Sequence, residues 1–396
     1  MTVADLRPAI AGPLAGATAG LAGLQPGDAF DPRVPATIVA AGLHRLPVPI
    51  EAGGLGGTMT ESAEVLAALG AQDGSTALGF AMHVHAVGSI TESAHWPAGP
   101  RERLYRSIVA DGALVNNAST EEGGGSPARG AIPGTVARRE PGSGGWRLTG
   151  EKTWTTWLPA LRFAFVSARI EDDREGAAAQ AAAPELGVFL MALDGDGVER
   201  RPAFEAMGMR GSSSGRLVLD DASVPPEALI TRRLAGEPDP RGAAPGAWFA
   251  MAVAATYLGV GEGARETVAR WALDRRPGDG STAVADIPTV QLRLGRLDAV
   301  LRAARIVLFH ATGRWDATGE EAARARVIPD LVLAKFTATN AAVAATDEAL
   351  RIAGGPGFLA GRLERAFRDA RAGLINPPLD DIALAGFGRA VLEAAR

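Results

Sequence analysis

The character of the chain changes twice along its length, and this order constrains the fold more than any other feature. Residues 1 to about 110 favour helices: apolar residues recur at helical spacing over 58–78, and Thr58 with Glu61 has the spacing of a capping box. Short strands and turns follow from about Ala113, and helix-forming sequence returns near Gly246. We therefore expect an α+β chain with a helical domain at 1–112, a β domain at 113–235 and a second helical domain at 236–396.

Composition narrows the class of protein. The chain has 396 residues and no cysteine, which excludes disulfides, thiolate catalysis and Cys-based metal sites; we expect no metal centre. The net charge of -5 offers no basic footprint for nucleic acid. The sequence lacks an uncharged apolar run of the ~20 residues that a membrane span needs, and its start lacks the pattern of a signal peptide. We expect a cytoplasmic enzyme with no nucleic-acid or membrane partner.

Individual elements can be placed inside these regions. Segments 136–138 and 146–149 flank a turn at 141–145 and predict a hairpin. Further strands are expected at 161–170, 186–193 and 216–219, with a charged loop at 171–184. Long helices are expected at 248–273, 290–315, 327–353 and 380–395.

Two segments of the β region suit a flat ring with polar edges. The run STEEGGGS (119–126) combines hydroxyl groups with glycines that let open backbone N–H groups approach a ligand. The run GEKTWTTW (150–157) offers an aromatic face at Trp154 and a hydroxyl at Thr156. Taken alone, the first could be an ordinary surface loop, and the second could hold a Trp buried in a β core.

Three later segments add glycines and guanidinium groups. The run MGMRGS (207–212) forms an Arg-Gly-Ser turn that we interpret as architectural. Arg275 and Arg276 offer the rigid forks that suit a pyrophosphate, and the alternative is a solvated charge pair at a helix end. The run GGPGF (354–358) lets the backbone lie close to a cofactor, or caps a helix, and the arginine-rich run LERAFRDAR (363–371) follows it.

In this order, and over nearly the whole chain, these segments resemble the acyl-CoA dehydrogenase superfamily of flavoproteins. The resemblance implies an N-terminal helical domain, a small β-barrel-like middle domain and a C-terminal four-helix bundle. It also implies FAD in preference to FMN, and a homotetramer in which an Arg reaches the cofactor of a neighbouring subunit. Carried over residue by residue, it places flavin contacts at Asn117, Ser119, Thr120, Ser126, Trp154, Thr156, Arg275, Arg276, Gln291, Gly354, Gly355 and Gly357.

The chain departs from the family at the catalytic base. The family carries a Glu in a Tyr-Glu-Gly-Thr run after the arginine-rich segment, whereas this chain reads NPPL (376–379), with Pro377 at the position of that Glu. The second base position of the family falls on Phe249 and Ala250. Proton abstraction next to a thioester needs a positioned base, and both expected positions are apolar.

Few side chains could replace that base. His83 and His85 lie on a helical segment that in the family runs toward the substrate, and they are either a general base or packed core residues. Asn376 could bond a substrate or cap the helix that follows. Asp380 and Asp381 fit better as first-turn residues that complement a helix dipole.

Three functions remain open. The main hypothesis is an FAD-dependent oxidoreductase that dehydrogenates an acyl thioester with a non-standard base. The alternative is a monooxygenase that uses reduced flavin and O₂; it needs no carboxylate base but needs a dry pocket, for which Trp157, Trp248 and Phe249 are candidates. The third is a non-catalytic flavoprotein. Expected partners are a small-molecule or acyl-thioester substrate and a flavin reductase or electron-transfer protein.

Overall fold

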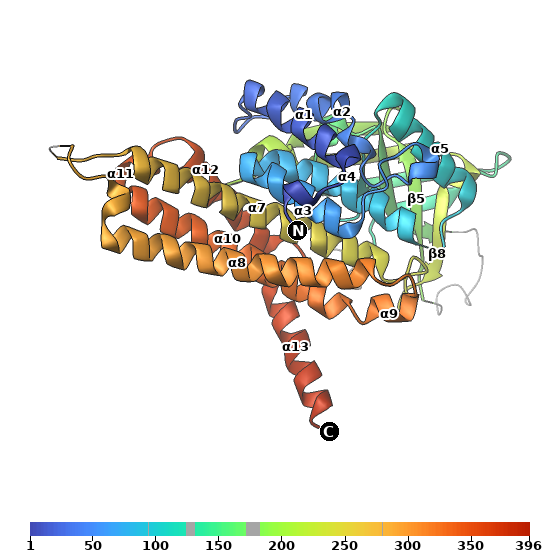
Figure 1. Cartoon of the computed structure of the whole chain (residues 1–396). Helices are drawn as coiled ribbons and strands as arrows, with labels where there is room; N and C mark the ends of the chain where they lie inside the picture. Colours follow the sequence, from blue (N-terminus) through green and yellow to red (C-terminus); the bar gives the residue numbers. More distant parts are fainter. Residues whose placement is uncertain (94, 124–130, 172–182, 279) are drawn as a thin grey trace.

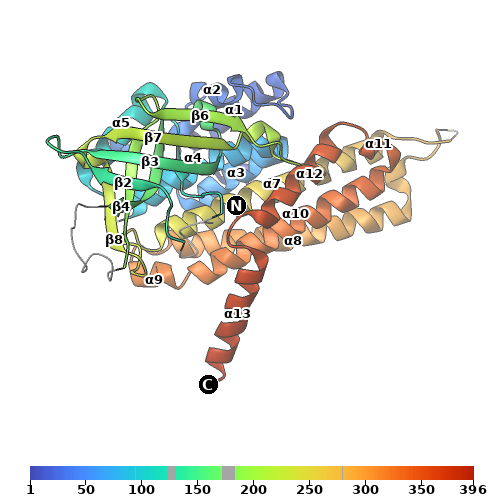
Figure 2. The same cartoon turned by 180° about the vertical axis from the view of Figure 1, so that it is seen from behind.

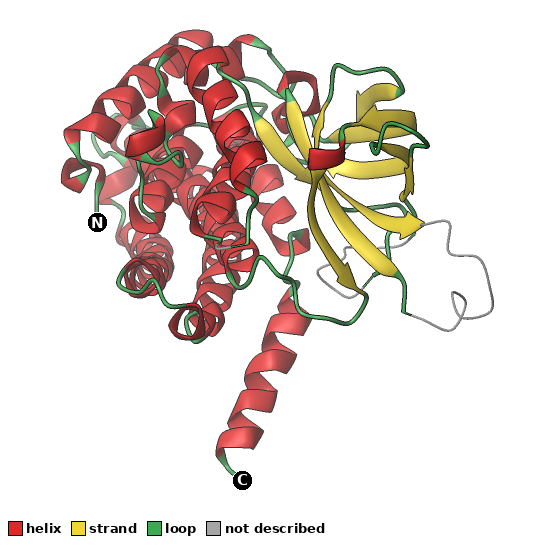
Figure 3. Cartoon of the chain, turned by 90° about the vertical axis from the view of Figure 1, so that its right-hand side faces the viewer, coloured by secondary structure: helices red, strands yellow, loops and turns green. Residues whose placement is uncertain are grey.

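The computed structural model describes residues 1–396 except 94, 124–130, 172–182 and 279. Ser126 and most of the predicted loop 171–184 therefore lie outside the described residues. Helices form both ends of the chain and the described strands between them form one sheet, so the predicted α+β class is confirmed (Figure 3).

The N-terminal helices are shorter than the sequence pattern predicts. Thr58 and Glu61 form the expected capping box: the Glu61 N–H donates to Thr58 Oγ1 at 3.2 Å, and the Thr58 N–H donates to Glu61 Oε2 at 3.0 Å. The predicted helix 58–78 is nevertheless two helices, because the Asp73 carboxylate accepts from the Thr76 N–H at 2.7 Å and starts a new one. The helices are α1 (Pro8–Leu24), α2 (Arg33–Ala40), α3 (Met59–Gln72), α4 (Gly74–Glu92) and α5 (Ala98–Asp111).

The sheet has eight strands in the order β6-β7-β3-β2-β4-β5-β8, and β1 pairs in parallel with β4. The predicted hairpin is present as the antiparallel pair β2–β3, and strands β1, β6 and β8 were not predicted. The strands are β1 (Val115–Ala118), β2 (Val136–Arg139), β3 (Trp146–Thr155), β4 (Phe163–Glu171), β5 (Glu185–Ala192), β6 (Val198–Ala203), β7 (Gly215–Val224) and β8 (Leu229–Leu234).

The four long C-terminal helices lie close to their predicted bounds. Helix α7 forms the centre of the core and packs against α3, α4, α10 and α12 (Figures 1 and 2). Helix α13 leaves this body and projects away from it in every view (Figure 3). The helices are α7 (Ala244–Asp274), α8 (Pro288–Asp316), α9 (Glu321–Ala325), α10 (Ile328–Ala353), α11 (Gly355–Phe358), α12 (Arg362–Ile375) and α13 (Asp380–Ala394).

Two stretches of the described chain, Ala244–Asp274 and Glu321–Ala353, are long and apolar enough to cross a membrane by length and composition. In the first stretch, which is α7, 83% of the apolar window is buried inside the protein, as expected for a core helix. In the second stretch, 44% of the apolar window is buried.

Candidate functional site

Strands β1 and β3 end side by side and bring two of the predicted polar segments together. The Thr153 N–H donates to the Thr120 carbonyl at 2.8 Å, which ties the loop after β1 to β3. The Thr156 side chain is buried, and its Oγ1 lies 2.9 Å from Oγ of Ser214. The Asn116 amide donates to the Thr156 carbonyl at 3.1 Å. The hydroxyls of Thr120 and Thr156 therefore come from one rigid corner of the sheet.

A buried ion pair that the sequence did not reveal fixes this corner. Lys152 is fully buried, and its Nζ donates to Glu121 Oε1 at 2.5 Å. Burial raises the pKa of Glu121, but the Lys152 ammonium and further hydrogen bonds outweigh it and lower that pKa below its usual value. Burial disfavours the charged form of Lys152 as well and lowers its pKa to about 8. Glu121 also accepts from Oγ1 of Thr135 at 2.6 Å, so the loop that carries Ser119 and Thr120 is anchored to the sheet.

Trp154 points away from the core. The pairing of β3 with β7 shifts register between Lys152 and Thr155, and Trp154 in this bulge has a φ of 56°. A bulge redirects a side chain, and the indole is accordingly 49% exposed and stacks on Phe204 with ring centroids 4.5 Å apart. Trp154 thus offers an aromatic surface beside the hydroxyl corner, as a flat ligand requires.

His85 meets Asn117 between helix α4 and strand β1. His85 Nε2 lies 3.2 Å from Asn117 Nδ2, and the Phe249 ring packs edge-on against the imidazole at 5.1 Å between centroids. Burial, together with the nearby Arg241 guanidinium, lowers the pKa of His85 to about 3. The His85 ring is therefore neutral near pH 7. Arg241 was not singled out from the sequence; it lies in the irregular segment before α7, where no spacing pattern marks it.

His83 is held by the backbone on both sides of its ring. Its Nε2 lies 2.8 Å from the His44 carbonyl, and its Nδ1 accepts from the Val115 N–H at 3.3 Å. The ring is buried, and burial lowers its pKa to about 4. Both nitrogens of the His83 ring are therefore engaged, and the ring has almost no solvent contact.

The predicted aromatic pocket residues line helix α4 at two glycines. A Cβ on Gly79 would lie 2.1 Å from the Trp157 ring, and a Cβ on Gly88 would lie 2.4 Å from the Trp248 ring. Both indoles are buried, and the glycines on which they pack lie before and after His85 along α4. Phe249 is half-buried beside His85. Of these three rings, Phe249 is the one that packs against His85.

Neither expected base position carries an acid, and the nearest candidate in sequence is already engaged. Asp380, which follows the Pro377-Pro378 pair, accepts from Nδ2 of Asn340 at 2.9 Å and lies 3.6 Å from Nζ of the buried Lys335. It begins α13, as the helix-dipole interpretation expects. Asn376 precedes α13 without capping it; its Oδ1 is buried and lacks a hydrogen-bond partner within the described chain.

The remaining predicted flavin contacts lie at the far end of the bundle from the sheet (Figure 1). Arg275, Arg276 and Gln291 are exposed around the loop between α7 and α8. The Gly354–Gly357 turn lies next to a surface hollow of about 130 Å³. Gly354 has a φ of 62°, which favours glycine, but a Cβ there or on Gly355 would meet open space. One chain therefore does not bring this group to the corner of Thr120 and Thr156.

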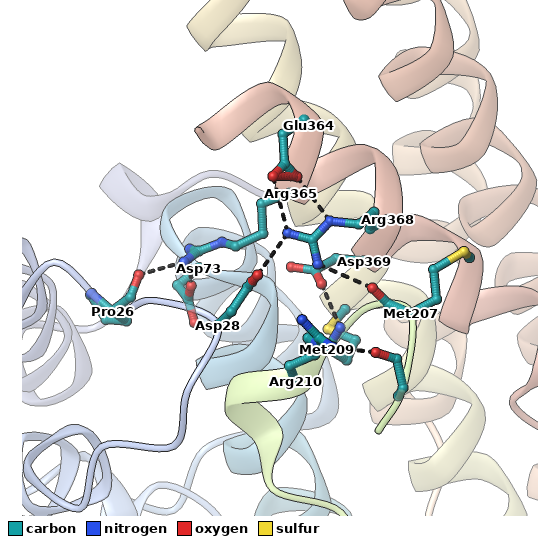
Figure 4. A network of polar contacts seen from close by, with 11 residues as sticks. Pro26, Asp28, Asp73, Met207, Met209, Arg210, Glu364, Arg365, Arg368 and Asp369 are labelled. Atoms are coloured by element: carbon teal, nitrogen blue, oxygen red, sulfur yellow. Dashed lines mark hydrogen bonds and ion pairs between the residues drawn. The ribbon is translucent and has the colours of Figure 1, made fainter. Parts of the chain in front are cut away.

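The arginine-rich segment is architectural (Figure 4). Arg365 forms an ion pair with the buried Asp73 at the start of α4 and donates to the Pro26 carbonyl at 2.5 Å. Arg368 donates to Asp28 at 2.9 Å, so α12 holds the N-terminal helices. Asp369 accepts from the Met209 N–H at 2.5 Å, which docks the Arg-Gly-Ser turn of the β region on α12; burial raises the pKa of this carboxyl to about 6.

The geometry defines the class of site: a corner of hydroxyls and amides beside an exposed indole and a neutral, water-shielded histidine. These groups fit the polar edge and flat face of a flavin. Among the described residues, no group of three or more His, Asp or Glu side chains is placed to hold a metal ion.

Comparison with known proteins identifies the family. The acyl-CoA dehydrogenase middle domain matches residues 116–222, and the acyl-CoA dehydrogenase C-terminal domain matches residues 247–376. The chain belongs to the acyl-CoA dehydrogenase superfamily and is an oxidoreductase of that flavin-dependent group.

Two curated proteins and one solved structure are similar to the chain. It is 34% identical to the putative acyl-CoA dehydrogenase YdbM of Bacillus subtilis over 86% of this chain and 84% of that protein. It is 30% identical to the amino sugar nitrososynthase RubN8 of Streptomyces rubradiris over 84% of this chain and 76% of that protein. The structure of FMN-bound TdsC, a dibenzothiophene monooxygenase from Paenibacillus sp. A11-2, superposes with a TM-score of 0.85 at 20% identity over 98% of each chain.

Proposed function

We propose that this protein is a flavin-dependent monooxygenase that receives reduced flavin from a separate reductase and oxygenates a nitrogen or sulfur atom of a small molecule. The observation that carries the proposal is that apolar residues, Pro377 and Phe249, stand at both positions where the family carries a carboxylate, and that Phe249 packs against the neutral His85. The amino sugar nitrososynthase among the relatives supports a heteroatom as the target.

The reaction balances with one O₂ and one reduced flavin for each substrate. One oxygen atom enters the substrate and the other leaves as water, and reduced flavin, when bound, supplies the two electrons. The residues of the chain bind and shield. Thr120, Thr156 and Asn117 offer hydrogen bonds to the polar edge of the ring. Trp157 and Trp248 are buried, and we assign them to keeping water out of the site.

His85 suits this chemistry better than it suits proton abstraction. A general base works best when its pKa lies near the operating pH, and burial holds the pKa of His85 at about 3. A neutral imidazole at that place can still donate or accept a hydrogen bond. We assign it to holding the reacting oxygen or the substrate heteroatom, with Asn117 fixing the ring orientation.

Dehydrogenation of an acyl thioester is the second candidate, because the putative acyl-CoA dehydrogenase YdbM is 34% identical. It needs a base that removes the α-proton. Pro377, Phe249 and Ala250 cannot ionise, Asp380 is bonded to Asn340, and both nitrogens of His83 are bonded to the backbone.

The cofactor is a flavin, and we propose FAD with a Kd near or below ~1 µM, on the order of −8 kcal/mol. We also propose that the protein is a homotetramer, because Arg275, Arg276 and the Gly354 turn could reach the corner of Thr156 only on a neighbouring copy. We propose a cytoplasmic location. Replacing Arg275 and Arg276 with Ala should then weaken FAD binding and leave FMN binding unchanged. Equal binding of FAD to the double variant and the parent would remove these arginines from the site.

The test of the reaction is oxygen incorporation. The purified protein is mixed with flavin, NADH, an unrelated flavin reductase and a panel of amines and thioethers under ¹⁸O₂. The masses of the products are then measured by mass spectrometry. The proposal predicts a product that carries one ¹⁸O and that requires both the reductase and this protein. Reduction of the bound flavin by an acyl-CoA without reductase would favour the dehydrogenase instead.

A further inference from the structure

A second ring covers one face of the exposed Trp154 indole. Phe204, the residue that follows strand β6, stacks on this indole with ring centroids 4.5 Å apart and ring planes inclined by 29°. Phe204 is half-buried, whereas Trp154 remains 49% exposed. A ring stacked on one face of an indole leaves the other face for a flat ligand. Trp154 therefore presents one open face beside the hydroxyl corner.

The backbone of Trp154 needs such a support. Its φ of 56° lies in the left-handed region, which a bulky residue adopts rarely and at a cost in free energy. A residue in this conformation persists only where the surrounding structure holds it. The stack on Phe204 supplies a hold at the place where the pairing of β3 with β7 is interrupted.

The backbone of Phe204 is joined to the second flavin contact that we place on this part of the chain. The Phe204 N–H donates to the Ser214 carbonyl at 3.0 Å. Oγ of Ser214 lies 2.9 Å from Oγ1 of Thr156. Phe204 is therefore linked to the Trp154 indole through its ring and to the Thr156 hydroxyl through Ser214.

Arg216 ties the Phe204 ring to the loop that carries Thr120. Its guanidinium carbon lies 5.2 Å from the centroid of the Phe204 ring, within the ~6 Å of a cation–π contact. Arg216 also pairs with Glu122 at 2.9 Å and with Glu151 at 2.8 Å. Glu122 lies two residues after Thr120, and Glu151 lies on β3. Phe204 thus lies where β3, β7 and the loop after β1 are joined.

The segment that follows Phe204 is held by the helical bundle (Figure 4). Asp369 of α12 accepts from the Met209 N–H at 2.5 Å. Gly208 packs against the same helix, because a Cβ there would lie 2.4 Å from the Arg368 carbonyl oxygen. The Phe204 ring is therefore anchored on the side of the sheet and on the side of the bundle.

We propose that Phe204 is a positioning residue for the flavin. It holds the Trp154 indole at one angle, so that the open face of the indole meets the flavin ring, and through Ser214 it keeps the Thr156 hydroxyl in place. This assignment rests on the place that we propose for the flavin, and it does not depend on what the flavin does to a substrate.

Titration of the apoprotein with FAD tests the assignment. Phe204→Leu keeps an apolar side chain but removes the ring, and it should raise the Kd of FAD about two- to ten-fold, which is the worth of an aromatic pair. Phe204→Tyr keeps the ring and should restore the Kd of the parent. Phe309→Leu is the matched control and should leave the Kd unchanged. Phe309 is also half-buried beside a guanidinium, that of Arg305 at 4.7 Å, but it lies on α8.

A double-mutant cycle shows whether Phe204 acts through Trp154. Trp154→Leu alone should weaken FAD binding, and adding Phe204→Leu to it should weaken binding no further, because the ring then has no indole to hold. Near-ultraviolet circular dichroism of the apoprotein should change at the tryptophan wavelengths in Phe204→Leu and not in Phe204→Tyr. Thermal unfolding shows whether each variant is folded, and Phe204→Met replaces Phe204→Leu if the latter is not.

Three results would overturn the assignment: a parent protein that does not bind FAD, an equal Kd in the parent and the folded ringless variant, or losses that add in the cycle. Oxygen incorporation by the parent is measured separately. A parent that oxygenates its substrate while Phe204→Leu binds FAD normally would keep the proposed function and remove Phe204 from the flavin site. A ring-dependent Kd without oxygenation would do the reverse.

Discussion

His85 Nε2 and Asn117 Nδ2 lie 3.2 Å apart, which joins helix α4 to strand β1 at the place where the sheet presents its hydroxyl groups. Phe249 packs against His85, which lies on the same helix as Gly79 and Gly88, the glycines that seat Trp157 and Trp248. A neutral imidazole so placed can orient a reacting group without removing a proton from carbon.

Replacing His85 with Gln should lower the rate of product formation at least ~10²-fold, the lower end of what a positioned hydrogen-bonding or acid–base group contributes. The flavin Kd should change little, because His85 is not among the proposed flavin contacts. Rates with enzymatically reduced flavin and a flavin titration separate the two quantities. His95→Gln, at an exposed histidine, is the control. Full activity in His85→Gln would remove this residue from the mechanism.

The buried histidines should make the fold sensitive to mild acid. An unfolded histidine binds a proton near pH 6.5, whereas burial holds the pKa of His83 at about 4. Unfolding therefore takes up a proton between these values, and the free energy of unfolding falls as pH is lowered from 6.5 to 4. For His83 the loss is on the order of 3 kcal/mol.

Urea unfolding across this pH range measures the effect. His83→Gln should flatten the dependence on pH, although the variant also loses stability at pH 7 because two backbone hydrogen bonds change. His95→Gln should leave the slope as it is. An equal slope in His83→Gln and the parent would show that His83 titrates normally.

Thr156→Val should weaken flavin binding. The hydroxyl pairs with Ser214 at the corner where we place the ring, and a lost hydrogen bond of ~1 kcal/mol corresponds to a several-fold higher Kd. Thr155→Val is a close control. Thr155 is also fully buried, but its hydroxyl has no hydrogen-bond partner within the described chain, so this change should leave the flavin Kd and the stability nearly unaltered. Equal Kd values for the two variants would place the flavin elsewhere.

Arg365→Ala should destabilise the fold by ~3–5 kcal/mol, because it leaves the buried Asp73 without its partner. Arg351→Ala removes an exposed pair with Asp347 one helical turn away and should cost less than ~0.5 kcal/mol. Thermal or denaturant unfolding of both variants checks the difference. A small effect of Arg365→Ala would mean that the contacts in Figure 4 do not hold the N-terminal helices to α12.

Local signals in the sequence were sufficient for the elements that depend on neighbours in the chain. The capping box of Thr58 and Glu61 and the hairpin of β2 and β3 involve residues close in sequence. The break at Asp73 was missed because the apolar pattern continues through it and hides the cap.

The tertiary contacts of the site could not be predicted in this way. Asp73 and Arg365 are 292 residues apart, and the burial of Lys152 against Glu121 depends on the complete sheet. The sequence predicted that Trp154 offers an aromatic face to a ligand. The outward direction of its side chain, however, follows from a register shift between β3 and β7 that no local pattern encodes. The flavin contacts were predicted from the resemblance to a family, and the surroundings of His83 and His85 became visible only in the fold.

The central claim is that this site lacks a base for removing a proton from an acyl thioester. Anaerobic titration of the oxidised, flavin-loaded protein with short-, medium- and long-chain acyl-CoA tests it most directly, with dithionite as the positive control for reduction. The account predicts that the visible spectrum of the oxidised flavin persists with every thioester and bleaches with dithionite. Bleaching by any acyl-CoA, with formation of the corresponding enoyl-CoA, would contradict it.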